Sequence, residues 1–156
     1  MSDHRRIRLV SAAIVVTLAL AGCTPSASAS AEHPSATESG GASPISLDNC
    51  GTTVDFTGAA PKRVITIKST STEMLLALGL GKAIVGTAFQ DGPVPAKWAK
   101  EAATIPVLAD KVPSQEVVLA TEPDLVYAGW ESNFSADGAG ARSDLQALGI
   151  QSYVSP

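Results

Sequence analysis

Short runs of β-branched and apolar residues alternate with helix-forming segments, and this alternation limits the possible fold more than any other feature of the chain. The strand-like runs lie at residues 64–67, 84–87, 105–108, 125–128 and 150–154. Five strands separated by helices predict a parallel α/β sheet with helices on both faces. Because ligands of such sheets bind beyond the carboxyl ends of the strands, the loops that follow these runs are the candidate site.

Local signals predict where two of the helices begin and end. The T-x-x-E pattern from Thr70 to Glu73 is typical of a capping box that opens a short helix, and Gly79 can end that helix. Ser114 is a suitable N-cap for a second helix over residues 115–121.

Two further elements are expected near the ends of the predicted sheet region. Residues 45–49 and 52–56 alternate in polarity and predict a small hairpin. Leu145 and Leu148 predict one apolar face of a last helix, which Gly149 would end.

The chain opens with an export signal. Three arginines precede the largely apolar residues 9–21, a stretch of 13 residues. A bilayer span needs about 20 residues, whereas a secretory signal needs fewer. The motif Leu-Ala-Gly-Cys that ends at Cys23 resembles the bacterial lipobox. We therefore expect residues 1–22 to be removed as a lipoprotein signal peptide and Cys23 to be lipidated. A plain export signal with an incidental cysteine is the alternative.

A low-complexity segment follows the lipobox. Ser, Ala, Thr, Gly and Pro make up 18 of the 21 residues in 24–44, a composition that cannot build a packed core. We expect residues 23–44 to be a lipidated cysteine and a disordered tether, with the folded part over residues 45–156. The protein would then be exported and anchored by its lipid to the outer face of the cell membrane.

Composition excludes several classes of function. The formal charge is −4, and removal of residues 1–22 takes away three arginines and one aspartate, which leaves −6. This acidic balance speaks against a nucleic-acid partner. His4 and His33 are the only histidines, and both precede the folded part. Histidine-based catalysis and histidine-rich metal sites are therefore not expected there, and we expect no enzyme activity, no metal and no cofactor.

The carboxyl end raises two expectations. The sequence stops directly after the strand at 150–154, which predicts an edge strand there and a longer gene product. After lipidation of Cys23, Cys50 is the one remaining thiol. It would be either buried and inert or bonded to a partner beyond Pro156, and we favour the second.

Several motifs, in order, resemble a known family. They are RVITI at 63–67, TEMLLALG at 72–79, IVG at 84–86 and EVVLATEPDLV at 116–126. Together they resemble the opening of the substrate-binding proteins of ATP-driven importers for iron-siderophores, haem and cobalamin, the Fe/B12 periplasmic-binding domain. The resemblance implies that residues 45–156 are the N-terminal lobe of a two-lobe class III periplasmic-binding fold with a Rossmann-like sheet. It also implies a binding lipoprotein that delivers a small molecule to ABC permease subunits driven by a separate ATPase.

A finer resemblance concerns the ligand. The strings IKST at 67–70, GTAF at 86–89, DGPVP at 91–95, KVPSQE at 111–116 and AGWESNFSADG at 128–138 are similar to an actinobacterial subgroup. That subgroup is proposed to take up a phospholactyl deazaflavin, a coenzyme precursor. An iron-siderophore or a related chelate is the other ligand class that the family implies.

The candidate ligand residues lie in the loops that follow the predicted strands. A flavin-like ring favours aromatic faces, and an anionic tail favours cations and free backbone amides. The residues expected to contact the ligand are Lys68, Thr70, Phe89, Gln90, Asp91, Lys111, Trp130, Asn133 and Phe134. The alternatives are that Phe89 only supports its loop, and that Lys68 and Lys111 are solvated rim charges.

Two glutamates have competing interpretations. Glu73 would complete the cap with Thr70. Glu116 matches the position from which the family presents a carboxylate to arginines of the permease. It also lies in the first turn of a predicted helix, where the helix dipole favours a carboxylate in any protein.

Two other classes of function compete with the binding protein. A lipid-anchored enzyme of the chelatase-like plan would need a pair of titratable residues that this stretch lacks. A surface adhesion or sensor module would have no deep ligand cleft.

Overall fold

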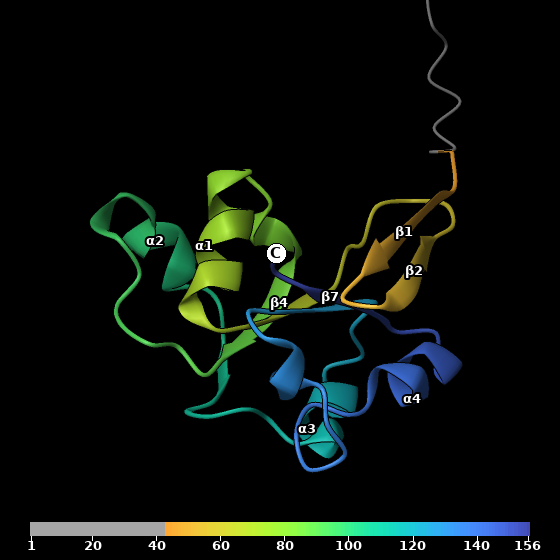
Figure 1. Ribbon diagram of the computed structural model, residues 1–156. Coiled ribbons are helices and arrows are strands. Elements are labelled where there is room, and N and C mark those ends of the chain that lie inside the picture. The colour runs from red at the N-terminus through yellow and green to blue at the C-terminus, as the bar shows by residue number, and fades with distance from the viewer. Residues whose placement is uncertain (1–42) are drawn as a thin grey trace, which may run out of the picture. The chain divides into compact units, whose positions relative to one another are not determined.

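The computed structural model describes residues 43–156, which form a parallel five-stranded sheet and a separate hairpin (Figure 1). The sheet order is β5-β4-β3-β6-β7, with β3 in the centre and β7 at one edge. The strands are β3 (Val64–Ile67), β4 (Ile84–Ala88), β5 (Val107–Ala109), β6 (Leu125–Ala128) and β7 (Gln151–Val154). Every pairing between them is parallel, so the predicted sheet and the predicted edge position of the last strand are confirmed.

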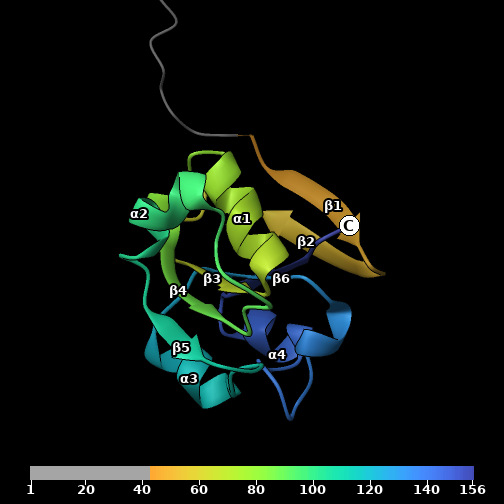
Figure 2. The ribbon, with the colours of Figure 1, turned by 90° about the vertical axis from the view of Figure 1, so that its left-hand side faces the viewer.

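Helices cover both faces of the sheet, as the alternation predicts (Figures 1 and 2). The α-helices are α1 (Ser69–Ala77), α2 (Ala99–Ala102), α3 (Gln115–Ala120) and α4 (Arg142–Ala147), and the 3₁₀ turns are η1 (Gly81–Ala83), η2 (Ala96–Trp98) and η3 (Glu131–Asn133). On one face, Ile65 and Val126 pack with Val118 of α3 and Leu145 of α4. A second core lies on the other face, where α1 and α2 pack.

The predicted hairpin is confirmed as β1 (Ile45–Asn49) paired with β2 (Thr52–Phe56). Cys50 lies in its turn with a φ of 56° and is exposed, so the less favoured alternative, a buried and inert thiol, is wrong. Within residues 43–156 it has no disulfide partner.

The side chain of Asn49 connects the hairpin to the sheet. Asn49 Nδ2 donates to the carbonyl oxygen of Val154 at 2.9 Å, and the Val154 amide donates to Asn49 Oδ1 at 2.7 Å. Asn49 is buried, and it satisfies both backbone groups of one residue in the edge strand β7.

A buried arginine extends the same connection. Arg142 of α4 donates from Nε to Ser152 Oγ at 2.9 Å, from Nη1 to the Asn49 carbonyl at 2.7 Å and from Nη2 to Asn49 Oδ1 at 2.9 Å. Arg142 is 7% exposed, and within residues 43–156 it pairs with no carboxylate. Its hydrogen bonds therefore hold α4, β7 and the hairpin together.

Helix α1 begins differently from the prediction. Lys68 is the residue before its first turn, and Thr70 lies inside the helix, so the capping box of Thr70 and Glu73 is wrong. Lys68 makes no side-chain cap and has a φ of 83°, because β3 passes into α1 with no intervening loop. The predicted end is confirmed, since Gly79 follows the helix with a φ of 73°.

One strand boundary also shifts, whereas Gly149 ends α4 as predicted, with a φ of 80°. Strand β5 covers 107–109 rather than 105–108; Pro106 has no N–H to donate and contributes only its carbonyl, which accepts from Thr87 N at 2.9 Å. Leu145 and Leu148 were predicted to share one apolar face. Leu145 packs into the core, whereas Leu148 follows the end of α4 and is 57% exposed.

Ser114 caps α3 as predicted, and its Oγ accepts from the Val117 amide at 3.4 Å. The predicted signal peptide, Cys23 and the tether up to residue 42 lie outside the described residues. None of the helices in 43–156 has the length and apolar character needed to cross a bilayer.

Candidate ligand-binding site

Two loops and the start of α1 meet where β4, β6 and β3 end. The last residues of these neighbouring strands are in register. The residues that follow them, Lys68, Phe89 and Trp130, are therefore brought together at the carboxyl edge of the sheet, where the sequence predicts the site.

The backbone around Lys68 is fixed by close contacts. The Lys68 amide donates to the Ala88 carbonyl at 3.0 Å, which continues the β3–β4 pairing by one residue. A Cβ atom added to Gly129 would lie 2.9 Å from both Cβ and Cγ of Lys68. Glycine at position 129 thus leaves the space that the lysine stem occupies.

The ammonium group of Lys68 lies between two aromatic rings. Its Nζ is 3.8 Å from the centroid of the Phe89 ring and 3.9 Å from that of Trp130, and the two rings meet at 87°. The Lys68 side chain is 4% exposed and forms an ion pair with Asp91, which is half exposed. This is the one ion pair within residues 43–156. We call Lys68, Phe89, Asp91 and Trp130 the Lys68 cluster.

Hydrogen bonds from neighbouring residues hold the cluster in place. The Asp91 amide donates to Ser69 Oγ at 2.8 Å. The Trp130 amide donates to Asn133 Oδ1 at 3.2 Å, and Asn133 is 2% exposed. In this structure Asn133 therefore positions the Trp130 loop, although the sequence predicts that it contacts ligand.

A group of hydroxyls lies near Lys68, between β3, α1 and β4. The Oγ1 atoms of Thr66, Thr72 and Thr87 are 2.8–3.1 Å apart. Gln90 Nε2 donates to Thr87 Oγ1 at 2.6 Å, whereas Gln90 Oε1 and Ser71 Oγ are buried without a hydrogen-bond partner. The sequence gives no sign of this network, because three threonines on different elements become neighbours only in the folded sheet.

The other predicted site residues are less closely associated with the cluster. Thr70 is exposed, and a Cβ on Gly129 would lie 3.1 Å from its Oγ1, so it borders the cluster. Phe134 packs on the core, with the Arg142 guanidinium 5.7 Å from its ring centroid. Lys111 is exposed on the loop after β5 and Glu116 is exposed in α3; within the described chain neither makes a side-chain hydrogen bond or an ion pair.

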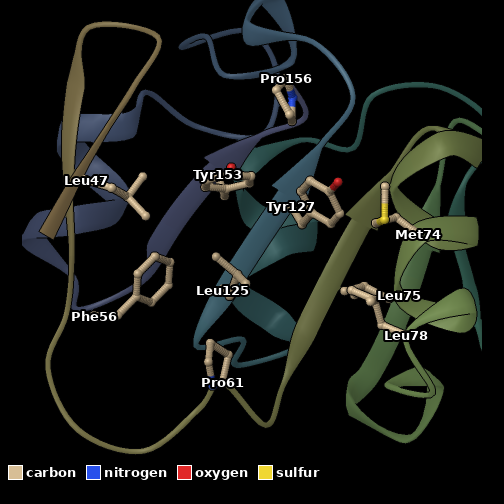
Figure 3. A pocket seen from close by; sticks show the side chains of 10 residues that line it. All are labelled: Leu47, Phe56, Pro61, Met74, Leu75, Leu78, Leu125, Tyr127, Tyr153 and Pro156. Carbon is tan, nitrogen blue, oxygen red and sulfur yellow. The ribbon is translucent and has the colours of Figure 1, made fainter. Parts of the chain in front are cut away.

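A separate apolar groove lies on the face of the sheet between the hairpin and α1 (Figure 3). It has a volume of about 460 Å³. Its lining side chains come from both hairpin strands, α1, β6 and β7, and include Phe56, Met74, Tyr127 and Tyr153. The sequence analysis did not predict this groove, which only the packing of the hairpin beside the sheet creates.

Metal-ligating side chains are scattered in the described part of the chain. No group of three or more His, Cys, Asp or Glu residues within 43–156 lies close enough to hold a metal ion. The Lys68 cluster itself offers aromatic stacking and charge recognition.

Comparisons with known proteins point to one kind of protein. No protein-family model matches the sequence. The chain is 29% identical over 147 residues to the uncharacterized ABC transporter substrate-binding lipoprotein YvrC of Bacillus subtilis (strain 168), a match that covers 94% of this chain and 44% of the relative.

Solved structures agree with that similarity. A periplasmic binding protein from Veillonella parvula matches with a TM-score of 0.62 and 28% identity, over 71% of this chain and 37% of that one. A protein of an ABC-type Fe³⁺-hydroxamate transport system from Saccharomonospora viridis matches with a TM-score of 0.59 and 29% identity, over 74% and 40%. The chain thus spans less than half the length of each of these relatives.

Two of these relatives are described as binding proteins and the third as part of a transport system, so the enzyme alternative is not favoured. Residues 43–156 therefore have the α/β fold of periplasmic binding proteins, and the sequence is similar to that of a substrate-binding lipoprotein of an ABC transporter.

Proposed function

We propose that this chain belongs to an extracytoplasmic solute-binding lipoprotein that captures a small molecule and delivers it to an ABC permease for import driven by a separate ATPase. The observation that carries the proposal is the Lys68 cluster. It places a buried cation and an exposed tryptophan at the carboxyl edge of a parallel sheet, which is where ligands of such sheets bind. Residues 45–156 would supply the N-terminal lobe of the binding cleft.

The ligand in this proposal is a phospholactyl deazaflavin, with an iron-siderophore or related chelate as the second candidate. The cluster suits a planar ring with an anionic tail because Trp130 is 55% exposed and can stack, and Lys68 supplies positive charge. The exposed Lys111, on the loop after β5, would be a second cation for the tail.

Tryptophan fluorescence tests this proposal directly. The chain has two tryptophans, so a Trp98→Phe variant reports on Trp130 alone, and a Trp130→Phe variant reports on Trp98. We expect a phospholactyl deazaflavin, or failing that a ferric siderophore, to quench the first variant with saturation, because the ligand binds against the exposed Trp130. Replacing Trp130 with leucine should weaken binding by about tenfold.

The Trp130→Phe variant is the matched control for absorption of light by the ligand itself. Equal quenching in both variants would show that Trp130 is not in the site. Saturable conversion of the compound into a product without the permease and ATPase would favour the chelatase-like enzyme instead.

Membrane anchoring gives a second prediction, and the two cysteines make a matched pair. A Cys23→Ser variant should lose incorporation of a labelled fatty acid and should move from the membrane to the soluble fraction, because no other thiol lies at the lipobox. A Cys50→Ser variant should keep both properties. Fatty-acid labelling that survives Cys23→Ser would contradict the proposed anchor.

Docking to the permease gives a third prediction. Glu116 is exposed in the first turn of α3, so a Glu116→Lys variant should bind ligand normally but support slower uptake, since a charge at the rim mainly affects the encounter rate. Asp144→Lys, exposed on α4, is the control and should leave uptake unchanged. Uptake that is equal in both variants would remove Glu116 from the docking surface.

A further inference from the structure

The two faces of the Trp130 indole have different surroundings. The ammonium nitrogen of Lys68 lies over one face, 3.9 Å from the ring centroid, and the lysine side chain is almost completely buried. The tryptophan as a whole is 55% exposed. Within the described residues Phe89 is the one aromatic ring paired with Trp130, and it meets the indole at 87°, so it does not stack on the open face.

A cation on one face changes what the other face attracts. An indole face normally carries negative potential and therefore attracts cations. The charge of Lys68 counteracts that potential, and its field extends through the ring to a ligand stacked about 3.5 Å beyond it. We infer that the open face of Trp130 selects planar rings that are anionic or electron-rich, and discriminates against cationic rings of the same shape. This inference rests on the proposed function and names the ligand class of that site.

Asp91 sets the strength of this preference. Its carboxylate is the ion-pair partner of Lys68 and is half exposed, so it partly cancels the lysine charge. The ammonium, and not the carboxylate, is the group that lies against the ring face. Loss of the Asp91 charge should therefore strengthen the preference for anionic rings, whereas loss of the Lys68 charge should abolish it.

Hydrogen bonds hold the backbone that carries the Trp130 ring. The Gly129 amide donates to the Ile67 carbonyl at 2.9 Å, and the amide and carbonyl of Trp130 both bond to Asn133. These contacts fix the tryptophan backbone on both sides, so little ordering is needed when a ring stacks.

Three planar dyes of similar size test the inference: anionic resorufin, neutral methoxyresorufin and cationic thionine. In the Trp98→Phe protein, quenching of Trp130 should give resorufin an affinity about tenfold higher than that of methoxyresorufin, with thionine the weakest.

A Lys68→Met change should make resorufin and methoxyresorufin bind equally. Asp91→Asn should widen their difference, and Lys68→Arg should keep it. Lys82→Met makes the same change in net charge at an exposed residue of η1, before β4 begins, and should have no effect on the ratio.

Equal affinities for the three dyes, no binding of any dye, or a preference that persists in a folded Lys68→Met protein would each overturn the inference. If Lys68→Met does not fold, the Asp91→Asn protein decides, because an unchanged ratio of resorufin to methoxyresorufin affinity in that protein would also contradict the inference. Failure of the proposed function is recognised separately. In that case neither a phospholactyl deazaflavin nor a ferric siderophore quenches Trp130, whereas failure of this inference alone leaves that quenching intact and removes only the charge preference.

Discussion

Replacing Arg142 with methionine is expected to lower the free energy of unfolding by about 3 kcal/mol. Methionine keeps the apolar stem but removes every hydrogen bond of the guanidinium. The carbonyl of Asn49 and the hydroxyl of Ser152 then remain buried without that donor. Urea unfolding followed by circular dichroism measures the change.

Arg63→Met is the matched control for this experiment. Arg63 also donates to two backbone carbonyls, those of Glu122 and Thr121, but it is exposed, so water replaces the lost bonds. The control should lose less than about 1 kcal/mol. Equal losses in the two variants would mean that burial of Arg142 does not determine its contribution.

The second large effect is expected at Gly129. Alanine there places a methyl group 2.9 Å from both Cβ and Cγ of Lys68. These two atoms lie next to the backbone, so they cannot move away as the flexible end of the side chain could. We expect a loss of about 2 kcal/mol in the free energy of unfolding from this overpacking. Lys68 must also shift away from Trp130, so ligand affinity should fall by about tenfold, measured by Trp130 fluorescence in the Trp98→Phe background.

Gly92→Ala is the control, because no atom lies within 4 Å of the added Cβ and the residue belongs to the loop that carries Asp91. It should leave stability and affinity nearly unchanged. A Gly129→Ala protein with unaltered stability and binding would show that the lysine stem is not confined as the structure describes.

The sheet could be predicted from sequence because its signals are local. β-branched runs such as residues 64–67, together with Gly79 and Ser114 at helix ends, report on backbone preferences within a few residues. The capping box failed because Lys68, at a φ of 83°, starts α1 before Thr70 can cap it. Tertiary register overrode a local preference there.

The contacts of the candidate site depend on distant pairs. The placement of Lys68 and Trp130 at one edge of the sheet was predictable, since both follow strands, but the position of the ammonium between two rings was not. The same holds for Arg142 and Asn49, which lie 93 residues apart in sequence. Periodicity reports which face of an element is buried, and carries no information on which polar groups meet across elements.

The bonds between Asn49 and Val154 have a consequence for self-association. An outermost strand with free N–H and C=O groups is a template on which another copy can add, and this is a common start of fibre growth. At Val154 the asparagine amide takes both of those groups, as an added strand would do. Within residues 43–156, Asn49 thus blocks the addition of another strand at Val154, and its loss would favour aggregation of this part of the chain as well as its unfolding.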